Sequence, residues 1–340
     1  MTAGVERLEP GLVRFRLTSP TLAPVNVYAM ESDAGWVLFD SGFTYSTDQL
    51  RDCLAQLGLR VDEVAAVFYT HTHEDHMGGG VSLGEAWNCP QYVWEGTRPA
   101  FENYYDYYDA CESWPVWLKR RMPPSEWMDR LRQLSSGRAP KAFRQGGDGI
   151  LHGAVGVPFG GVVTVGGRRF RCEDARGHDP YHCVWHDEQC DRLVTGDIVL
   201  GLPTPLLERI GDNITRYRAT LLRWQAAPEP ALLLPGHGRP SAGLARSLER
   251  SLGYLEEGYA LTVKFLEAGE VLEPLGAVLG SFETLGPAQF QVAFIRLANT
   301  MSQLDEMAQV GLVEQGEDLF WRCRWPLPAY ADYLKLVERF

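Results

Sequence analysis

One short segment, residues 70–79, constrains the fold of this chain more than any other. It reads THTHEDHMGG and places three histidines and two carboxylates within the six residues 71–76. An apolar run, VAAVFY at 64–69, precedes it, and three glycines occupy positions 78–80. A buried strand that ends in clustered histidines and then turns on glycine is typical of a metal site. Imidazole and carboxylate together suit Zn²⁺ and, less selectively, Fe or Mn.

The spacing of these side chains indicates more than their composition does. His71 and His73 are separated by one residue, so in an extended segment they point to the same side, and Asp75 continues that alternation. His76 breaks the alternation and faces the same cavity only if the chain turns there, as at the start of a helix. Four ligands on one short loop are too crowded for a single catalytic tetrahedral ion. The segment therefore predicts two metal ions.

Three other predicted strands end in a shared pattern, a glycine followed by a metal-ligand side chain. The strands are 168–176, 192–194 and 231–234, and the pairs are Gly177-His178, Gly196-Asp197 and Gly236-His237. A lone histidine at a strand end is more often structural than a ligand. Loops at strand ends are nevertheless where α/β folds gather their functional residues. We therefore expect these three residues to complete the site.

Together these residues resemble the metallo-β-lactamase-fold hydrolases. The order is His71-x-His73-x-Asp75-His76, followed by His178, Asp197 and His237. Asp40-Ser41-Gly42 matches the Asp-x-Gly turn of that family, and the resemblance spans about residues 10–240. It implies an α/β fold, the four-layer αββα metallo-β-lactamase sandwich, in which two mixed sheets lie face to face with helices outside.

The resemblance also implies which residues would hold which ion. His71, His73 and His178 would bind the first metal, Asp75, His76 and His237 the second, and Asp197 would bridge both. A metal-bound water has its pKa lowered to about 7 and attacks an acyl carbon or a phosphorus as hydroxide. Asp75 is the expected catalytic residue, because it can orient that hydroxide and accept a proton.

The leading functional hypothesis is a dinuclear zinc hydrolase that uses a metal-bound hydroxide on a small ester, thioester or lactone. A phosphodiesterase or ribonuclease is one alternative, because related branches use the same ligands. An iron-dependent redox enzyme of the same fold is a further alternative. Its di-iron branch carries a carboxylate where this chain has His73, which disfavours that variant. A non-enzymatic binding module is the weakest hypothesis, since all seven ligand positions are filled.

A long aromatic insertion, about residues 96–149, separates His76 from His178 and is predicted to be helical. Residues 119–144 hold eight bases and two acids, although the whole chain has a formal net charge of −12. We predict a lid or wall that offers aromatic faces and cations to an anionic, partly apolar substrate. The alternative is a helical pair that packs on the core. The candidate substrate-binding residues are Trp114, Trp117, Arg120, Arg121, Tyr181 and His182, with a structural role as the alternative for His182.

The pattern along the chain divides it into two parts. We expect a catalytic domain over residues 1–268 and a small α+β module over 269–340. A predicted helix at 287–309 and a hairpin of 311–313 with 319–321 resemble the winged-helix extension that some hydrolases of this family carry. Residues 270–340 contain ten acids and five bases, which disfavours binding to nucleic acid. A homodimer contact or a wall of the active site fits this module better.

The composition of the chain limits its expected cellular location and its expected binding partners. The chain has 340 residues and no apolar run of the kind that a signal peptide or membrane span requires. Its seven scattered cysteines include no C-x-x-C pair, which indicates reduced thiols in the cytoplasm. The acidic net charge disfavours nonspecific binding to nucleic acid or anionic membranes. A small-molecule substrate is the expected partner.

Overall fold

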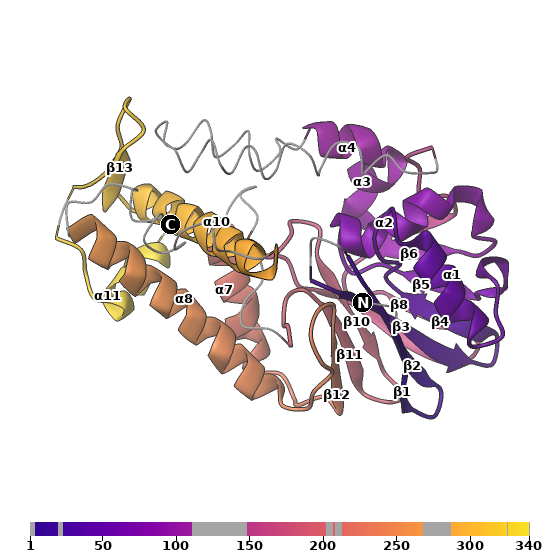
Figure 1. The fold of residues 1–340 in the computed structure, drawn as a ribbon. Helices are drawn as coiled ribbons and strands as arrows, with labels where there is room; N and C mark the ends of the chain where they lie inside the picture. Colours follow the sequence, from indigo (N-terminus) through magenta and orange to yellow (C-terminus); the bar gives the residue numbers. More distant parts are fainter. Residues whose placement is uncertain are drawn as a thin grey trace.

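The computed structural model describes residues 4–19, 23–110, 148–201, 207, 213–267, 287–324 and 326–339. Two mixed β-sheets lie face to face in this part of the chain, with helices on their outer sides (Figure 1). This is the αββα arrangement predicted from the sequence, in which each sheet buries one face against the other sheet and one against helices.

The first sheet has seven strands that follow one another in chain order. They are β1 (Gly4–Glu9), β2 (Leu12–Leu17), β3 (Val25–Ser32), β4 (Gly35–Phe39), β5 (Ala66–Phe68), β6 (Gln91–Trp94) and β7 (Ala154–Val157). Neighbours are antiparallel from β1 to β4 and parallel from β4 to β7. Parallel neighbours need crossover connections. The loops that follow β4 and β5 therefore leave the sheet at the same edge.

The second sheet has five strands in the order β12, β11, β10, β9, β8. Their bounds are β8 (Val162–Val165), β9 (Arg168–Asp174), β10 (Cys183–Asp187), β11 (Arg192–Gly196) and β12 (Leu232–Pro235). Strands β11 and β12 are parallel, and β10 runs antiparallel to both β9 and β11. The loops after β9, β11 and β12 consequently leave the second sheet at one edge.

Aromatic side chains fill the space between the two sheets. Phe68 of β5 lies 4.9 Å, centroid to centroid, from both Phe170 and Trp185 of the second sheet. The indole N–H of Trp185 donates to the Tyr69 carbonyl at 2.9 Å. A strand that is covered on both faces reads as a continuous apolar run, which explains the sequence that precedes the histidine segment.

Helices cover the outer face of each sheet. On the first sheet they are α1 (Thr47–Ala55) and α2 (Glu74–Leu83), and on the second α7 (Asn213–Trp224) and α8 (Leu244–Glu267). Short 3₁₀ turns span Val61–Glu63, Gly84–Ala86 and Glu95–Thr97. The insertion begins with α3 (Arg98–Glu102) and α4 (Tyr104–Ala110).

The three glycines after the histidine segment lie inside α2, so the predicted turn on glycine is wrong. The chain turns earlier, because α2 already begins at Glu74 with His73 as its N-cap. The glycines instead allow a close approach to neighbouring residues. A Cβ on Gly79 would lie 2.2 Å from the Ser41 carbonyl oxygen, and one on Gly80 would lie 1.9 Å from Tyr69 Oη. The glycines thus let the helix pack directly on the turn that follows β4.

The C-terminal part contains α10 (Pro287–Gln309), β13 (Val313–Gln315), β14 (Trp321–Cys323) and α11 (Tyr330–Val337). The predicted helix and hairpin are both present, with the paired strands displaced by two residues toward the C-terminus. Tyr259 of α8 packs in one cluster with Met301, Trp321 and Tyr333. The first half of α8 packs on the second sheet, so this helix belongs to both cores. The winged-helix resemblance and the boundary at residue 268 stay predictions.

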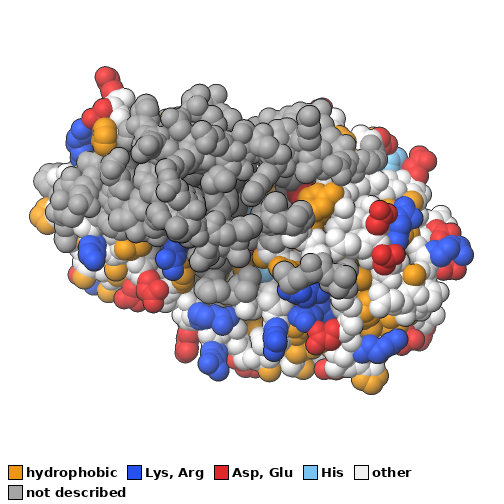
Figure 2. Space-filling model, in the orientation of Figure 1, with side chains coloured by type: hydrophobic (Ala, Val, Ile, Leu, Met, Phe, Trp, Pro, Cys, Tyr) orange, Lys and Arg blue, Asp and Glu red, His pale blue; other side chains and the backbone are white. Residues whose placement is uncertain are grey.

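Charged side chains of both signs are interspersed over the described surface in Figure 2. Among the described residues, no helix combines the length and apolar character that crossing a membrane demands. The six cysteines in the described part of the chain are all free thiols.

Candidate metal centre

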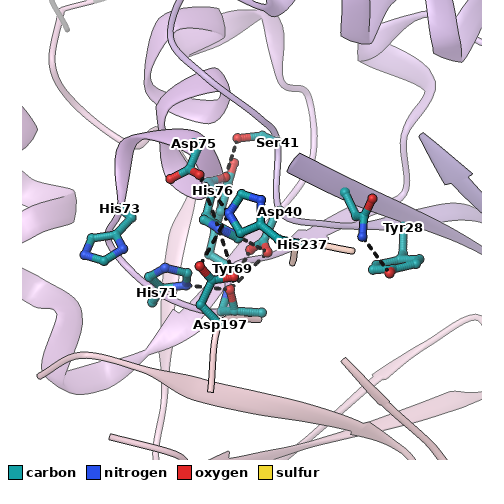
Figure 3. Close-up of polar contacts among 12 residues, drawn as sticks. Tyr28, Asp40, Ser41, Tyr69, His71, His73, Asp75, His76, Asp197 and His237 are labelled. Carbon is teal, nitrogen blue, oxygen red and sulfur yellow. Dashed lines mark hydrogen bonds and ion pairs between the residues drawn. The ribbon is translucent and has the colours of Figure 1, made fainter. Parts of the chain in front are cut away.

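Loops from both sheets meet at one edge of the sandwich and bring the predicted ligands together. His71 and His73 follow β5, Asp75 and His76 lie in the first turn of α2, and His178, Asp197 and His237 follow β9, β11 and β12. Figure 3 shows His71, His76, Asp197 and His237 turned toward one another, with Asp75 beside them.

Three overlapping groups of side chains have ligand atoms within 4.8 Å of one another. They are His71, His73 and His178; His71, His76 and Asp197; and Asp75, His76 and His237. Every one of the seven residues predicted as ligands falls in at least one group. The first and third groups share no residue, which gives the centre two halves.

Asp197 lies between the two halves. Its Oδ2 is 3.7 Å from His178 Nε2 and 3.4 Å from His237 Nε2, and its Oδ1 is 3.5 Å from His76 Nε2. Atoms that bind one tetrahedral zinc ion at about 2.0–2.1 Å lie roughly 3.4 Å apart. These separations therefore fit atoms that share an ion better than direct hydrogen bonds.

Asp40 orients two of the histidines. Its Oδ2 lies 2.8 Å from His76 Nδ1. The hydroxyl of Thr70 donates to the same carboxylate at 3.0–3.1 Å and lies 2.9 Å from His71 Nδ1. These contacts favour the tautomer with the proton on Nδ1 in both histidines, which leaves Nε2 to bind a metal. The Asp-Ser-Gly turn, matched in the sequence only as a motif, thus positions ligands.

Buried nitrogen and oxygen atoms in the centre lack hydrogen-bond partners. They are His71 Nε2, His76 Nε2 and Asp197 Oδ1. A buried polar atom is destabilising unless it is satisfied. Burial and the nearby His76 lower the pKa of His71 well below its ordinary value, so its imidazole is neutral. A neutral imidazole is the form that binds a metal, and a set of nitrogen and carboxylate ligands fits Zn²⁺.

Charge in the second half of the centre also fits a cation. His237 Nε2 lies 3.1 Å from Asp75 Oδ2. Burial raises the pKa of Asp75, but the neighbouring His76 and His237 outweigh it and hold the pKa below its ordinary value. Burial lowers the pKa of His237, whereas Asp197 and Asp75 together raise it to about 10. The carboxylates of Asp75 and Asp197 thus converge on His237 Nε2 at 3.1 and 3.4 Å, and buried carboxylates need a cationic partner, which a metal ion can supply.

Two residues beside the centre act through the backbone of the ligand loops. His182 is fully buried, and its Nε2 accepts the backbone N–H of Asp197 at 3.0 Å. This placement favours the structural alternative for His182 over contact with substrate. Asp179 accepts the N–H and the hydroxyl of Thr72 at 2.9 and 2.6 Å. Asp179 was not predicted from the sequence, although its place directly after His178 was a signal.

The candidate substrate residues divide by position. Tyr181 lies at the centre's edge, with its ring centroid 5.8 Å from that of Tyr107 and 6.2 Å from that of Trp94. The hydroxyl of Tyr107 lies 3.2 Å from Oγ1 of Thr72, the residue between His71 and His73 in the chain. Trp114, Trp117, Arg120 and Arg121 fall outside the described residues.

The family model for the metallo-beta-lactamase superfamily matches residues 20–237. The chain belongs to that superfamily. Crystal structures support the fold. A metallo-beta-lactamase family protein from Thermus thermophilus has a TM-score of 0.70 at 20% identity, covering 94% of this chain and 100% of that one. A beta-lactamase domain protein from Burkholderia ambifaria has a TM-score of 0.65 at 19% identity, covering 94% of both chains.

One curated relative adds a named activity. The atrochrysone carboxyl ACP thioesterase AgnL7 of Paecilomyces divaricatus is 26% identical over 239 residues. The match covers 69% of this chain and 57% of that protein, so the chain spans less than two thirds of the relative's length.

Proposed function

We propose that this chain is a dinuclear zinc thioesterase that acts on acyl thioesters. The observation that carries the proposal is the position of Asp197, whose Oδ2 lies 3.7 Å from His178 and 3.4 Å from His237. One carboxylate can thus serve both halves of the centre. The choice of a thioester as the substrate is supported by the similarity of the chain to an acyl carrier protein thioesterase.

The proposed division of labour assigns each side chain a task. His71, His73 and His178 would hold one ion, Asp75, His76 and His237 would hold the other, and Asp197 lies where it could contribute to both halves. When bound, the ions supply Lewis-acid activation of water and of the acyl carbonyl near neutral pH. Asp75 orients the attacking water and accepts its proton, because its side chain is 19% exposed, more than the 9% of Asp197. A thiolate, whose thiol has a pKa of about 8.5, leaves more readily than an alkoxide.

An aromatic strip leads away from the His73–His178 side of the centre. It consists of Tyr107, Tyr181, Trp94 and Phe159, all partly exposed. The Trp94 and Phe159 rings stack with centroids 4.5 Å apart, and the Arg176 guanidinium lies 5.3 Å from the Trp94 ring. Such faces suit a planar, apolar acyl group. The net positive stretch at 119–144 favours a carboxylate or phosphate elsewhere on the same substrate.

The direct test is hydrolysis by zinc-loaded protein of a benzoyl thioester, an acetyl thioester, an oxygen ester and a phosphodiester. We expect the benzoyl thioester to have the highest kcat/KM. Asp75→Asn should lower kcat by about 10²-fold or more, because it removes both the proton acceptor and a ligand charge.

Variants separate the aromatic strip from the chemistry. Tyr181→Ala and Trp94→Ala should raise the KM for the benzoyl thioester and leave the KM for the acetyl thioester unchanged. Leu222→Ala is the control, because that side chain is 48% exposed on α7. Cleavage of the phosphodiester without thioester hydrolysis, or near-native turnover by Asp75→Asn, would contradict the proposal.

A further inference from the structure

The loop that carries His237 is fastened from the opposite sheet. The loop follows β12 of the second sheet, yet its backbone receives hydrogen bonds from the start of β3 in the first sheet. The N–H of Asn26 donates to the Gly236 carbonyl at 2.7 Å. His237 Nδ1 in turn lies 2.8 Å from the Pro24 carbonyl oxygen. The position of this ligand therefore depends on a segment of the first sheet that is remote in the chain. His237 and Pro24 are 213 positions apart.

Two side chains of β3 complete this fastening. Asn26 Nδ2 donates to the Pro235 carbonyl at 2.8 Å and to the Gly238 carbonyl at 3.0 Å. Tyr28 Oη donates to the Pro235 carbonyl at 2.8 Å and lies 3.2 Å from Asn26 Nδ2. The two residues thus grip the loop on both sides of His237. Arg14 of β2 adds a bond to the Gly238 carbonyl at 2.9 Å.

Asn26 and Tyr28 direct their polar groups to the loop, although the ring of Tyr28 also packs in the core between the sheets. They are 2% and 1% exposed, and a buried amide or phenol destabilises a protein unless it is hydrogen-bonded. Asparagine is also disfavoured within strands. An apolar residue at position 26 would suit the strand and the core better. The amide therefore serves the loop rather than the strand.

The loop packs tightly against the centre. A Cβ on Gly236 would lie 2.3 Å from Asp197 Oδ1 and 2.5 Å from His76 Cε1. The backbone beside His237 therefore touches two other ligand side chains. A small shift of the loop moves His237 relative to Asp75 and Asp197, which lie 3.1 and 3.4 Å from its Nε2. Figure 3 shows Tyr28 on the His237 side of the centre and His73 on the other.

We propose that Asn26 and Tyr28 are positioning residues for His237, and that they set the zinc affinity of the Asp75–His76–His237 half without affecting the other half. The inference rests on the two-ion site of the proposed function. Residues that orient metal ligands typically change metal affinity by about 10–100-fold when removed. Asn26→Leu keeps the branched shape of the side chain and removes both of its N–H donors, and Tyr28→Phe removes a single hydroxyl.

The test is zinc binding to the full chain, measured by competition with a chromophoric chelator that resolves two binding steps. His237→Ala and His178→Ala identify which step belongs to which half. Asn26→Leu should weaken the His237 step by about 10-fold or more and leave the His178 step unchanged. Tyr28→Phe should weaken the same step by less, because Asn26 still donates to Pro235. Excess zinc should restore the kcat of both variants.

Val27→Ala is the matched control. Val27 lies between the two positioning residues and is fully buried on the opposite face of β3. The Val27→Ala substitution should lower the thermal stability of the metal-free protein and leave both zinc-binding steps unchanged. The proposal is overturned if Asn26→Leu binds both ions normally, or if both steps weaken together. A wild-type protein with a single zinc step overturns the two-ion site as well. Two normal steps without thioester hydrolysis contradict the proposed function alone.

Discussion

Asp40 and His76 form a fully buried pair in which Asp40 Oδ2 lies 2.8 Å from His76 Nδ1. Asp40 also has a backbone φ of +62°, a conformation that asparagine and aspartate tolerate better than most residues. The same carboxylate reaches His71 through the Thr70 hydroxyl. A single acidic side chain thus holds one ligand from each half of the centre.

Asp40→Asn keeps the shape and the backbone conformation of this residue but removes its charge. We expect zinc affinity to fall by about 10–100-fold in both halves, because two histidines lose the group that fixes their tautomer. Chelator competition measures this effect. If zinc affinity fell in only one half, Asp40 would not orient His71 through the Thr70 hydroxyl.

The close packing of α2 on the turn after β4 predicts a sharp difference between two glycines. Gly79→Ala should destabilise the fold by about 1–3 kcal/mol, because its Cβ would meet the Ser41 backbone 2.2 Å away and the helix must move. Gly253→Ala in α8 is the control, since nothing lies within 4 Å of that Cβ. It should stabilise by up to about 1 kcal/mol through helix propensity. Denaturant unfolding measures both, and equal effects would contradict this packing.

The C-terminal part is joined to the catalytic part by a buried ion pair. Arg218 of α7 donates two hydrogen bonds of 2.9 Å to Glu306 of α10, and the side chains are 6% and 3% exposed. Removing one partner leaves an unpaired buried charge, which typically costs about 3–5 kcal/mol. Arg218→Met and Glu306→Gln should each destabilise by this order, and the double variant should be more stable than either. Additive losses in urea unfolding would refute the pairing.

The same pair predicts a pH dependence. Burial raises the pKa of Glu306, but hydrogen bonds from Arg218 outweigh it, so the pKa lies below its ordinary value. The unfolded chain then binds the proton more readily than the folded one. The contribution of the pair is therefore fully present above the unfolded pKa of about 4.3 and is lost as pH falls through the lower folded pKa. The free-energy difference between wild type and Glu306→Gln should shrink on acidification, and a constant difference would contradict this assignment.

The ligands were predictable from the sequence because each sits next to a local signal. His71 to His76 are contiguous, and His178, Asp197 and His237 each follow a glycine at a strand end. The roles of the residues that orient these ligands could not be predicted locally, because their partners are remote in the chain. Asn26 meets Pro235 across 209 positions, and Asp40 meets His76 across 36.

Several elements of the fold were not predicted, and two of them, β1 and α11, were missed for a related reason. Strand β1 is charged, VERLE at 5–9, and mostly exposed, so it shows no apolar alternation. It is held by pairing with β2 and by the ion pair of Glu6 with Arg14. Helix α11 is eight residues long and is stabilised by the stacking of Tyr333 on Tyr259, a contact between distant segments. Tertiary packing rather than local propensity determines such short elements.

The central claim is that one centre holds two ions through seven side chains. The most direct measurement is the zinc content of the full chain after loading and removal of loose metal, compared with that of His237→Ala and His178→Ala. The account predicts about two ions per chain for the wild type and about one for each variant, because each substitution removes a ligand from a different half. A wild-type content near zero, or one ion that either substitution abolishes, would contradict it.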